Sequence, residues 1–364
     1  MSGDIQVVHI AGARPNFPKA APVIRALADR GIRQHLVHTG QHYDERMSDV
    51  FFRQLGLPEP DQNLAVGSGS HASQTGETMV RLEALFRESR PRLVVVYGDV
   101  NSTLAAALVA AKLTIPIAHV EAGLRSFNRS MPEEINRLVT DRLADLLFAT
   151  SPDALVHLGN EGIAAEKVFF VGNPMIDTLL ANLHLFEASA IGRQLNLPDQ
   201  YAVATLHRPA NVDDPGDAAE LVKVMHGVAD RIQVVVPLHP RGRENLAHAG
   251  FFRHPGIRVI DPLGYIEFLS LVRGARAVVT DSGGVQEETT VLGVPCLTLR
   301  AETERPVTIS HGTNRLVTRE ELVESVTGLL SAERRTDGWP VPPLWDGRAG
   351  ERIAEVIARF VGTD

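Results

Sequence analysis

The feature that most constrains the fold is the alternation of short apolar runs with longer segments of helical pattern along almost the whole chain. Residues 93–96 (LVVV) and 234–236 (VVV) are continuously apolar, which is typical of parallel strands covered by helices on both faces. Strands that alternate with helices predict an α/β protein with parallel sheets. The predicted strands are residues 5–10, 34–38, 93–97, 117–120, 146–149, 168–171, 201–206, 232–237, 257–260, 277–280 and 295–299. The predicted helices are residues 19–27, 74–86, 103–113, 133–145, 218–229 and 285–292.

Two segments share one pattern and point to two domains of the same kind. Residues 94–123 have the pattern of a strand, a loop with Asp99, a small-residue helix and a strand that ends at Glu121. Residues 277–304 have the same order of elements, with Asp281 in the corresponding loop. We therefore expect two Rossmann-like, doubly wound domains, 1–173 and 174–348, with the final helix at 349–364 packing back on the first. A long helical segment, 175–195, leads into the second. Ligands of such sheets bind beyond the carboxyl ends of the strands, so we expect the site in the cleft between the domains.

Composition excludes several classes of function. The chain has 364 residues, with 36 basic and 44 acidic residues, a net charge of −8 and no basic stripe of the kind that binds nucleic acid. No apolar stretch approaches the ~18 residues needed to span a bilayer, and the N-terminus lacks the basic start of a signal peptide. Cys296 is the one cysteine, so no intrachain disulfide is possible. We expect a cytoplasmic enzyme or binding protein with no membrane or nucleic-acid partner.

A basic loop follows the first predicted strand, and a glycine-rich loop follows the predicted strand 277–280 in the second half. Arg14 and Lys19 come after the first strand, where a loop and a helix N-terminus suit an anion, although both could be solvated surface residues. The loop lacks GxGxxG, which disfavours dinucleotide binding. In the second half, Ser282, Gly283 and Gly284 precede a helix whose N–H groups can bind phosphate, and Glu288 could accept hydrogen bonds from a ribose diol. A plain tight turn is the alternative.

Three acidic residues fall at predicted strand ends or helix starts of the first half: Asp99, Glu121 and Glu133. Their convergence predicts general acid/base work. Asp99 could instead cap the following helix, and one of Glu133 and Glu134 could serve the helix dipole. His207 and Arg208 end a strand of the second half and suit a phosphate contact.

Other chemistries are less well supported. His35 and His38 are three residues apart on a strand and point to opposite faces, so a metal site with His42 is not expected. No nucleophile elbow supports serine hydrolase chemistry.

These residues lie in motifs that resemble the non-hydrolysing UDP-N-acetylglucosamine 2-epimerase family. The matching segments, in order, are GARPNFPKAAPV, HTGQHYD, GDVNSTLAAALVAAK, HVEAGLRS, MPEEINR, VGNPMIDTL, TLHRPANVD, DSGGVQEE and ERPVT, which cover nearly the whole chain. The resemblance implies two Rossmann-like domains of the glycosyltransferase-B type, with the active site between them, in a homodimer.

The resemblance also implies roles for individual residues. Asp99, Glu121 and Glu133 correspond to the acid/base carboxylates, with His207 assisting the diphosphate. The implied UDP-binding set is Arg14, Lys19, Arg208, Phe268 (packing on uracil), Ser282, Gly283, Gly284 and Glu288. Many bacterial relatives bind a second UDP-GlcNAc as an effector, and Gln41, His42 and His239 match that site. Because Asp44 and Ser73 stand where those relatives carry Gln and Arg, we expect activation to be weak or absent.

The implied reaction is reversible C2 epimerisation of UDP-GlcNAc to UDP-ManNAc, through elimination of UDP to a glycal and re-addition. It requires cationic groups for the departing diphosphate and carboxylates for the proton, with no metal or redox cofactor. Two alternatives remain: a hydrolysing 2-epimerase that releases ManNAc and UDP, and a UDP-sugar glycosyltransferase of the same fold. A transferase needs only one base, so the three carboxylates argue against it.

Overall fold

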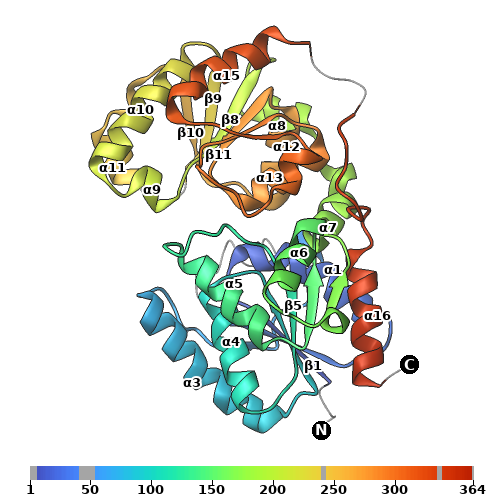
Figure 1. Cartoon of the computed structure of the whole chain (residues 1–364). Helices are drawn as coiled ribbons and strands as arrows, with labels where there is room; N and C mark the ends of the chain where they lie inside the picture. The colour runs from blue at the N-terminus through green and yellow to red at the C-terminus, as the bar shows by residue number, and fades with distance from the viewer. Residues whose placement is uncertain (1–5, 41–53, 239–242, 334–337, 363–364) are drawn as a thin grey trace. The chain divides into compact units, whose positions relative to one another are not determined.

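The computed structural model describes residues 6–40, 54–238, 243–333 and 338–362. The chain divides into two compact units, the first Met1–Ala181 with Pro343–Asp364 and the second Asn182–Pro342. Each unit is a twisted parallel sheet with helices on both faces (Figure 1). The predicted α/β class with two Rossmann-like domains is therefore confirmed.

The first unit is built on a sheet whose described strands run in the order β3-β2-β1-β4-β5-β6-β7, all parallel. The strands are β1 (Val7–Ala11), β2 (Gln34–His38), β3 (Gln62–Asn63), β4 (Leu93–Tyr97), β5 (Ile117–Ala122), β6 (Leu146–Ala149) and β7 (Val168–Phe170). The helical elements are η1 (Arg14–Asn16), α1 (Phe17–Ala28), α3 (His71–Ser89), α4 (Asn101–Lys112), α5 (Pro132–Leu143), α6 (Pro152–Asn160), η2 (Ala165–Lys167), α7 (Pro174–Asn182) and α16 (Ala349–Val361). The strand order reverses between β1 and β4, the usual place for a ligand in such a sheet.

The second unit repeats this topology, with described strands in the order β10-β9-β8-β11-β12-β13. The strands are β8 (Tyr201–Thr205), β9 (Gln233–Pro237), β10 (Ile257–Ile260), β11 (Ala277–Thr280), β12 (Cys296–Thr298) and β13 (Asn314–Leu316). The helical elements are η3 (Leu183–Leu185), α8 (Ala188–Gln194), α9 (Pro209–Val212), α10 (Pro215–Ala229), α11 (Arg243–His248), η4 (Phe251–Arg253), α12 (Tyr265–Gly274), α13 (Gly283–Leu292), α14 (Val307–Ser310) and α15 (Arg319–Ser331). Its strand order reverses between β8 and β11.

The apolar runs that predicted the strands form the cores. In the second unit, one cluster contains Val234 and Val236, and the cluster on the opposite face contains Val235, so successive residues of β9 are buried on both sides. The same alternation explains why these strands read as continuously apolar.

Capping residues set where several helices begin. The Asp214 side chain accepts hydrogen bonds from the backbone N–H groups of Gly216 and Asp217, and Pro215 occupies the first position of α10. This helix consequently starts before residue 218, where the apolar pattern alone placed it. Thr318 and Glu321 form a capping box at the start of α15.

The predicted helix 175–195 is wrong as a single element, because the chain forms α7, η3 and α8 there. The predicted boundary after residue 173 also differs from the division after Ala181. Two buried contacts tie α7 to the first unit: the Thr178 hydroxyl donates to the Pro18 carbonyl at 2.6 Å, and the Gly350 N–H donates to the Asp177 carboxylate at 2.7 Å.

The last helix, α16, lies along α1 in the first unit (Figure 1). A side chain at Gly350 would lie 2.7 Å from the backbone of Pro22, so glycine permits the close approach of the two helices. The buried face of α16 contains Ile353, Ile357 and Val361, which recur at helical spacing.

Candidate active site

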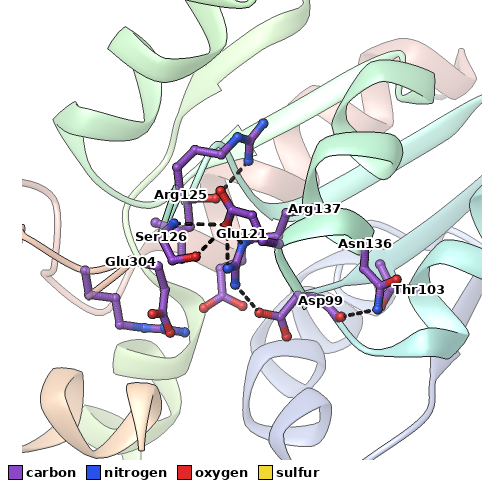
Figure 2. A network of polar contacts seen from close by, with 12 residues as sticks. Asp99, Thr103, Glu121, Arg125, Ser126, Asn136, Arg137 and Glu304 are labelled. Carbon is purple, nitrogen blue, oxygen red and sulfur yellow. Dashed lines mark hydrogen bonds and ion pairs between the residues drawn. The ribbon is translucent and has the colours of Figure 1, made fainter. Parts of the chain in front are cut away.

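Asp99 follows β4 and faces a buried arginine. Its Oδ2 lies 2.5 Å from Nη1 of Arg137, and its side chain keeps 26% of its surface exposed. Figure 2 shows Arg137 reaching the carboxylate while Asn136 donates to the Asp99 carbonyl, at 2.8 Å. The N-cap of α4 is Val100, with no side-chain capping bond, so the alternative that Asp99 caps this helix is wrong. Asp99 is thus an accessible carboxylate held at one end by a cation.

Glu121 ends β5 in a strained backbone conformation. Its φ is +74°, in the left-handed region, and the pairing of β5 with β6 shifts register between Val120 and Ala122. This bulge directs the buried Glu121 side chain to Lys19 of α1, with which it forms an ion pair. A left-handed backbone conformation at a residue other than glycine is strained, and it persists where the surrounding structure holds the residue in place.

Lys19 is positioned by its ion pair with Glu121, and its side chain is 8% exposed. Nearby, the Asn16 side chain closes the loop after β1 by accepting from the N–H groups of Gly12 and Ala13, both at 3.0 Å. Arg14 lies in η1, and its side chain is outside the described part of the structure.

The two glutamates at the start of α5 differ in their surroundings. Glu134 is buried and accepts from the N–H groups of Ser126 and Phe127, each at 3.0 Å, and from Arg137 at 2.7 Å. Burial alone would raise the pKa of Glu134, but these hydrogen bonds and the Arg137 charge hold it below its usual value. Glu133 is partly exposed, and no polar partner for it is found among the described residues. The structural member of the pair is therefore Glu134.

In the second unit, Asp281 follows β11 and organises the end of the neighbouring strand β8. Its carboxylate accepts from the backbone N–H groups of His207 and Arg208, at 3.0 and 2.9 Å, and from the Asn211 amide at 3.0 Å. His207 Nδ1 lies 3.1 Å from the same carboxylate, a pairing that orients the imidazole and fixes the proton on Nδ1. Burial would raise the pKa of Asp281, but His207 and these donors keep it low.

The N-terminus of α13 is lined by an arginine–glutamate cluster. Ser282 is the N-cap, and Arg208 donates through Nε to the Asp281 carbonyl at 2.9 Å. Glu304 is buried and contacts Arg300 at 2.8 Å, Arg208 at 3.7 Å and also Arg305. A Cβ on Gly283 would fall 2.3 Å from Nη1 of Arg305, so glycine is required here to make room for this guanidinium. Arg305 also pairs with Glu287 at 2.9 Å, so the arginines of this cluster are balanced by carboxylates. The groups suited to phosphate here are the backbone N–H groups at the start of α13 and the nearby Arg208 guanidinium.

Glu288 lies further along α13 and is buried, and the described residues include no cation paired with it. Burial, and next the charge of Glu287, raise its pKa to about 8. A carboxyl protonated at neutral pH offers one donor and several acceptor lone pairs, which suits a diol. Phe268 of α12 is partly exposed and packs against the apolar cluster that contains Leu271 and Val285.

Some expected site residues cannot be placed. Gln41, His42 and His239 of the expected effector site lie outside the described residues. Ser73 is described, and its N–H donates to the Ser70 hydroxyl that caps α3. Within the described ranges, no cluster of three or more His, Cys, Asp or Glu residues could hold a metal ion. Nor is any helix there long and apolar enough to cross a membrane.

Comparison with known proteins decides the family. The sequence profile described as UDP-N-acetylglucosamine 2-epimerase matches residues 25–358. A UDP-N-acetylglucosamine 2-epimerase of Methanocaldococcus jannaschii is 42% identical over 363 residues, covering 96% of this chain and 97% of the relative. The chain belongs to the UDP-N-acetylglucosamine 2-epimerase family.

Other relatives of this epimerase family extend the comparison. The UDP-2,3-diacetamido-2,3-dideoxy-D-glucuronate 2-epimerase of Pseudomonas aeruginosa is 41% identical over 364 residues, covering 98% of this chain and all of the relative. The crystal structure of the M. jannaschii epimerase in complex with UDP-GlcNAc and UDP superposes with a TM-score of 0.90, covering 97% of this chain and 99% of that one.

Several residues at the candidate site of this epimerase-family chain were missed by the sequence reading. They are Arg137, His119, Asp281, Arg300, Glu304 and Arg305, all of which support other polar residues through tertiary contacts. Arg137, His119, Asp281, Glu304 and Arg305 fall inside motifs that carried the family resemblance, which was the available signal.

Proposed function

We propose that the chain interconverts UDP-GlcNAc and UDP-ManNAc by non-hydrolysing epimerisation at C2. The observation that carries the proposal is the pair of carboxylates at the ends of the neighbouring strands β4 and β5. Asp99 and Glu121 each form an ion pair with a buried cation, Arg137 and Lys19 respectively. A carboxylate held in place in this way can act as a general base towards a bound sugar.

The chemistry requires departure of UDP before the proton is removed. The C2 hydrogen of an N-acetylhexosamine has no adjacent carbonyl and is hardly acidic. When UDP leaves from C1, the C1–O bond breaks with its electron pair on the diphosphate, and the oxocarbenium-like centre makes the C2 proton removable. Loss of that proton gives a glycal. Return of a proton to the opposite face, with re-addition of UDP at C1, gives the C2 epimer.

We assign the two kinds of work to the two units. Arg208 and the N-terminus of α13 would stabilise the negative charge of the departing diphosphate, with His207 assisting. Asp99, Glu121 and Glu133 would remove and return the proton. Phe268 and Glu288 would contact the nucleoside. No step needs a metal or an electron carrier, because the sugar is neither oxidised nor reduced overall.

The decisive experiment is incubation with UDP-GlcNAc in D₂O, followed by NMR. We expect UDP-ManNAc with deuterium at C2, the same final mixture from either epimer, and scrambling of an ¹⁸O label placed in the C1–O–P bridge. Release of free ManNAc with stoichiometric UDP would favour the hydrolysing alternative. Full epimerisation with C2 protium retained would contradict the elimination route.

A second substrate has a specific observation in its favour. The Pseudomonas relative named for a UDP-2,3-diacetamido-2,3-dideoxy-D-glucuronate is 41% identical, almost the same as the 42% of the Methanocaldococcus relative. The same C2 chemistry applies to both sugars, which differ at C3 and C6. A comparison of kcat/KM for the two nucleotide sugars distinguishes them, and the larger value identifies the preferred substrate.

A further inference from the structure

A fully buried ionic pair lies directly beneath the two strand ends that carry Asp99 and Glu121. His119 of β5 and Asp141 of α5 are both 0% exposed, and the imidazole Nδ1 lies 2.6 Å from Oδ1 of Asp141. The other oxygen of Asp141 lies 2.7 Å from Nη2 of Arg125, which also binds Glu161. Two positive and two negative groups thus balance one another within the first unit.

The hydrogen bonds define the charge of the histidine. Its Nε2 lies 2.8 Å from the carbonyl oxygen of Gly98, and its Nδ1 faces the Asp141 carboxylate. Both partners are acceptors, so both ring nitrogens must donate, and His119 is an imidazolium. Burial would raise the pKa of Asp141, but the charges of His119 and Arg125 hold it below its ordinary value.

The His119–Asp141 pair forms hydrogen bonds with the backbone at two points, one in the loop after β4 and one in the loop after β5. Through Nε2, His119 binds the carbonyl of the residue before Asp99. Asp141 accepts from the N–H of Gly123, two residues after Glu121, at 3.0 Å. Gly98 and Gly123 both have left-handed φ values, +64° and +82°. The Gly98 N–H donates to the Val120 carbonyl of β5 at 3.0 Å, and His119 adds a second contact through the Gly98 carbonyl. At Gly123, Asp141 supplies the acceptor for the backbone N–H, so the His119–Asp141 pair contacts both loops.

Gly98 also lies close to the Glu121–Lys19 ion pair. A Cβ built on Gly98 would lie 3.0 Å from both Oε2 of Glu121 and Nζ of Lys19. Any shift of this peptide consequently moves Asp99 along the chain and disturbs the Glu121–Lys19 ion pair through space.

We propose that His119 and Asp141 are positioning residues that set the relative placement of the Asp99 and Glu121 carboxylates. The proposal rests on the proposed function, in which these carboxylates handle the C2 proton. Small misplacements of a proton acceptor cost large factors in rate, whereas nucleotide binding by the second unit does not depend on this pair.

His9 provides a matched control within the same sheet. It is fully buried on β1, which flanks β4 on the side opposite β5, and it binds Tyr97 at 2.7 Å and Gln34 at 2.8 Å. Burial lowers the pKa of His9 to about 4, so this ring is neutral. Its hydrogen bonds do not reach the Gly98 carbonyl or Gly123.

The test compares Asp141→Asn, His119→Gln and His9→Gln. Each is measured for Tm, for the Kd of UDP and for kcat and KM with UDP-GlcNAc, with kcat expressed per molecule that binds UDP. We expect Asp141→Asn and His119→Gln to lower kcat by ~10-fold or more, with KM and the Kd of UDP within about twofold of wild type. His9→Gln is expected to lower Tm while its kcat stays within about twofold.

The outcomes separate the two proposals. A wild-type chain that binds UDP but does not epimerise UDP-GlcNAc overturns the proposed function, and the inference with it. An active wild type whose Asp141→Asn and His119→Gln variants keep kcat within twofold overturns the inference alone. An equal loss of kcat in His9→Gln also overturns it, since general loosening of the sheet would then explain the effect.

A second measurement needs no variant that might fail to fold. In wild-type protein labelled with ¹⁵N-histidine, both ring nitrogens of His119 should show the shifts of N–H donors, because both face acceptors. A His119 spectrum with one ring nitrogen unprotonated would contradict the double donation on which these backbone contacts depend.

Discussion

Asp99 and Asp281 occupy corresponding places in the two units but have opposite surroundings. Each follows the strand that comes fourth in its own sheet, β4 or β11, just after the point where the strand order reverses. The Asp99 side chain is 26% exposed, and its carboxylate pairs with Arg137. Asp281 is 0% exposed and accepts from backbone N–H groups, an amide and an imidazole.

The difference shows that the same fold position can hold either an accessible carboxylate or one that fixes the neighbouring backbone. The donors that surround Asp281 saturate its oxygens, so that it can only fix the backbone of His207 and Arg208. Asn136 donates to the backbone carbonyl of Asp99 and not to its carboxylate, so part of the carboxylate stays exposed. The motif GD of the first unit and the motif DSGG of the second therefore lead to different roles for the same residue type.

The largest expected effect comes from replacing Asp99, the exposed aspartate, or Glu121 on the neighbouring strand. Asp99→Asn and Glu121→Gln should each lower kcat by ~10²-fold or more, because an amide cannot accept the C2 proton. Steady-state kinetics with UDP-GlcNAc and the Kd of UDP check this, and UDP binding should change little. A variant that retains near-native kcat would assign that carboxylate to a structural role.

Glu133 and Glu134 of α5 provide a second comparison between an accessible carboxylate and a buried one. Glu133→Gln should lower kcat to a similar extent with little change in Tm. Glu134→Gln should mainly lower Tm, because Glu134 accepts from Ser126, Phe127 and Arg137. The reverse pattern would show that the catalytic member of the pair is Glu134.

Loss of the Asp281 charge should affect stability and binding together. Asp281→Asn leaves backbone donors facing an amide N–H group, which costs about 1 to 3 kcal/mol, and loosens His207 and Arg208. Because folding lowers the pKa of Asp281, its stabilisation is present above the unfolded value of 3.8 and is lost as pH falls through the folded value. The Tm difference from wild type should therefore shrink below pH 4, and Kd for UDP at pH 7 should rise.

Sequence reasoning located the strand ends because burial leaves a local signature. Strands such as β4, β6, β10 and β11 have the predicted bounds, since their apolar runs end at turn residues. It missed β3 and β13, which are two- and three-residue strands at sheet edges with polar sequences, QN and NRL. The 175–195 helix was overextended because the chain passes from one unit to the other there, at a place without Gly or Pro.

The partners of the site residues left no comparable signature. Asp99 and Glu121 were predicted because they directly follow strands. The contact of Arg137 with Asp99 spans 38 positions and that of Lys19 with Glu121 spans 102, so no local pattern reveals them. Likewise, Gly283 was predicted to precede a phosphate-binding helix, but no local pattern indicated Arg305, which the structure shows beside it.

A smaller effect is expected from filling the space at Gly283. Gly283→Ala would place a methyl group 2.3 Å from Nη1 of Arg305 and displace this guanidinium, without removing a charge. We expect the Kd of UDP to rise by ~10-fold, equivalent to about 1.4 kcal/mol. Isothermal titration measures it, with Gly328→Ala of α15 as the control, since nothing lies within 4 Å of a side chain there. Equal binding by both variants would show that Arg305 does not shape the anion site.

A last effect, on stability and not on binding, concerns the buried carboxylate of Glu288, for which the described residues provide no ion-pair partner. Burial raises the pKa of Glu288 from 4.5 to about 8, so the folded state favours its protonated form. The unfolded chain ionises first as pH rises, and the stabilisation present below pH 4.5 is therefore lost between about pH 4.5 and 8. Glu288→Gln copies the neutral form and escapes this loss. Its Tm relative to wild type should rise by several degrees between pH 5 and 8 and then stay level, as measured by scanning calorimetry. The fully exposed Glu320 provides the control, because Glu320→Gln should show no such trend over the same range. A Tm difference for Glu288→Gln that is independent of pH would mean that burial does not raise the pKa of Glu288 in the folded protein.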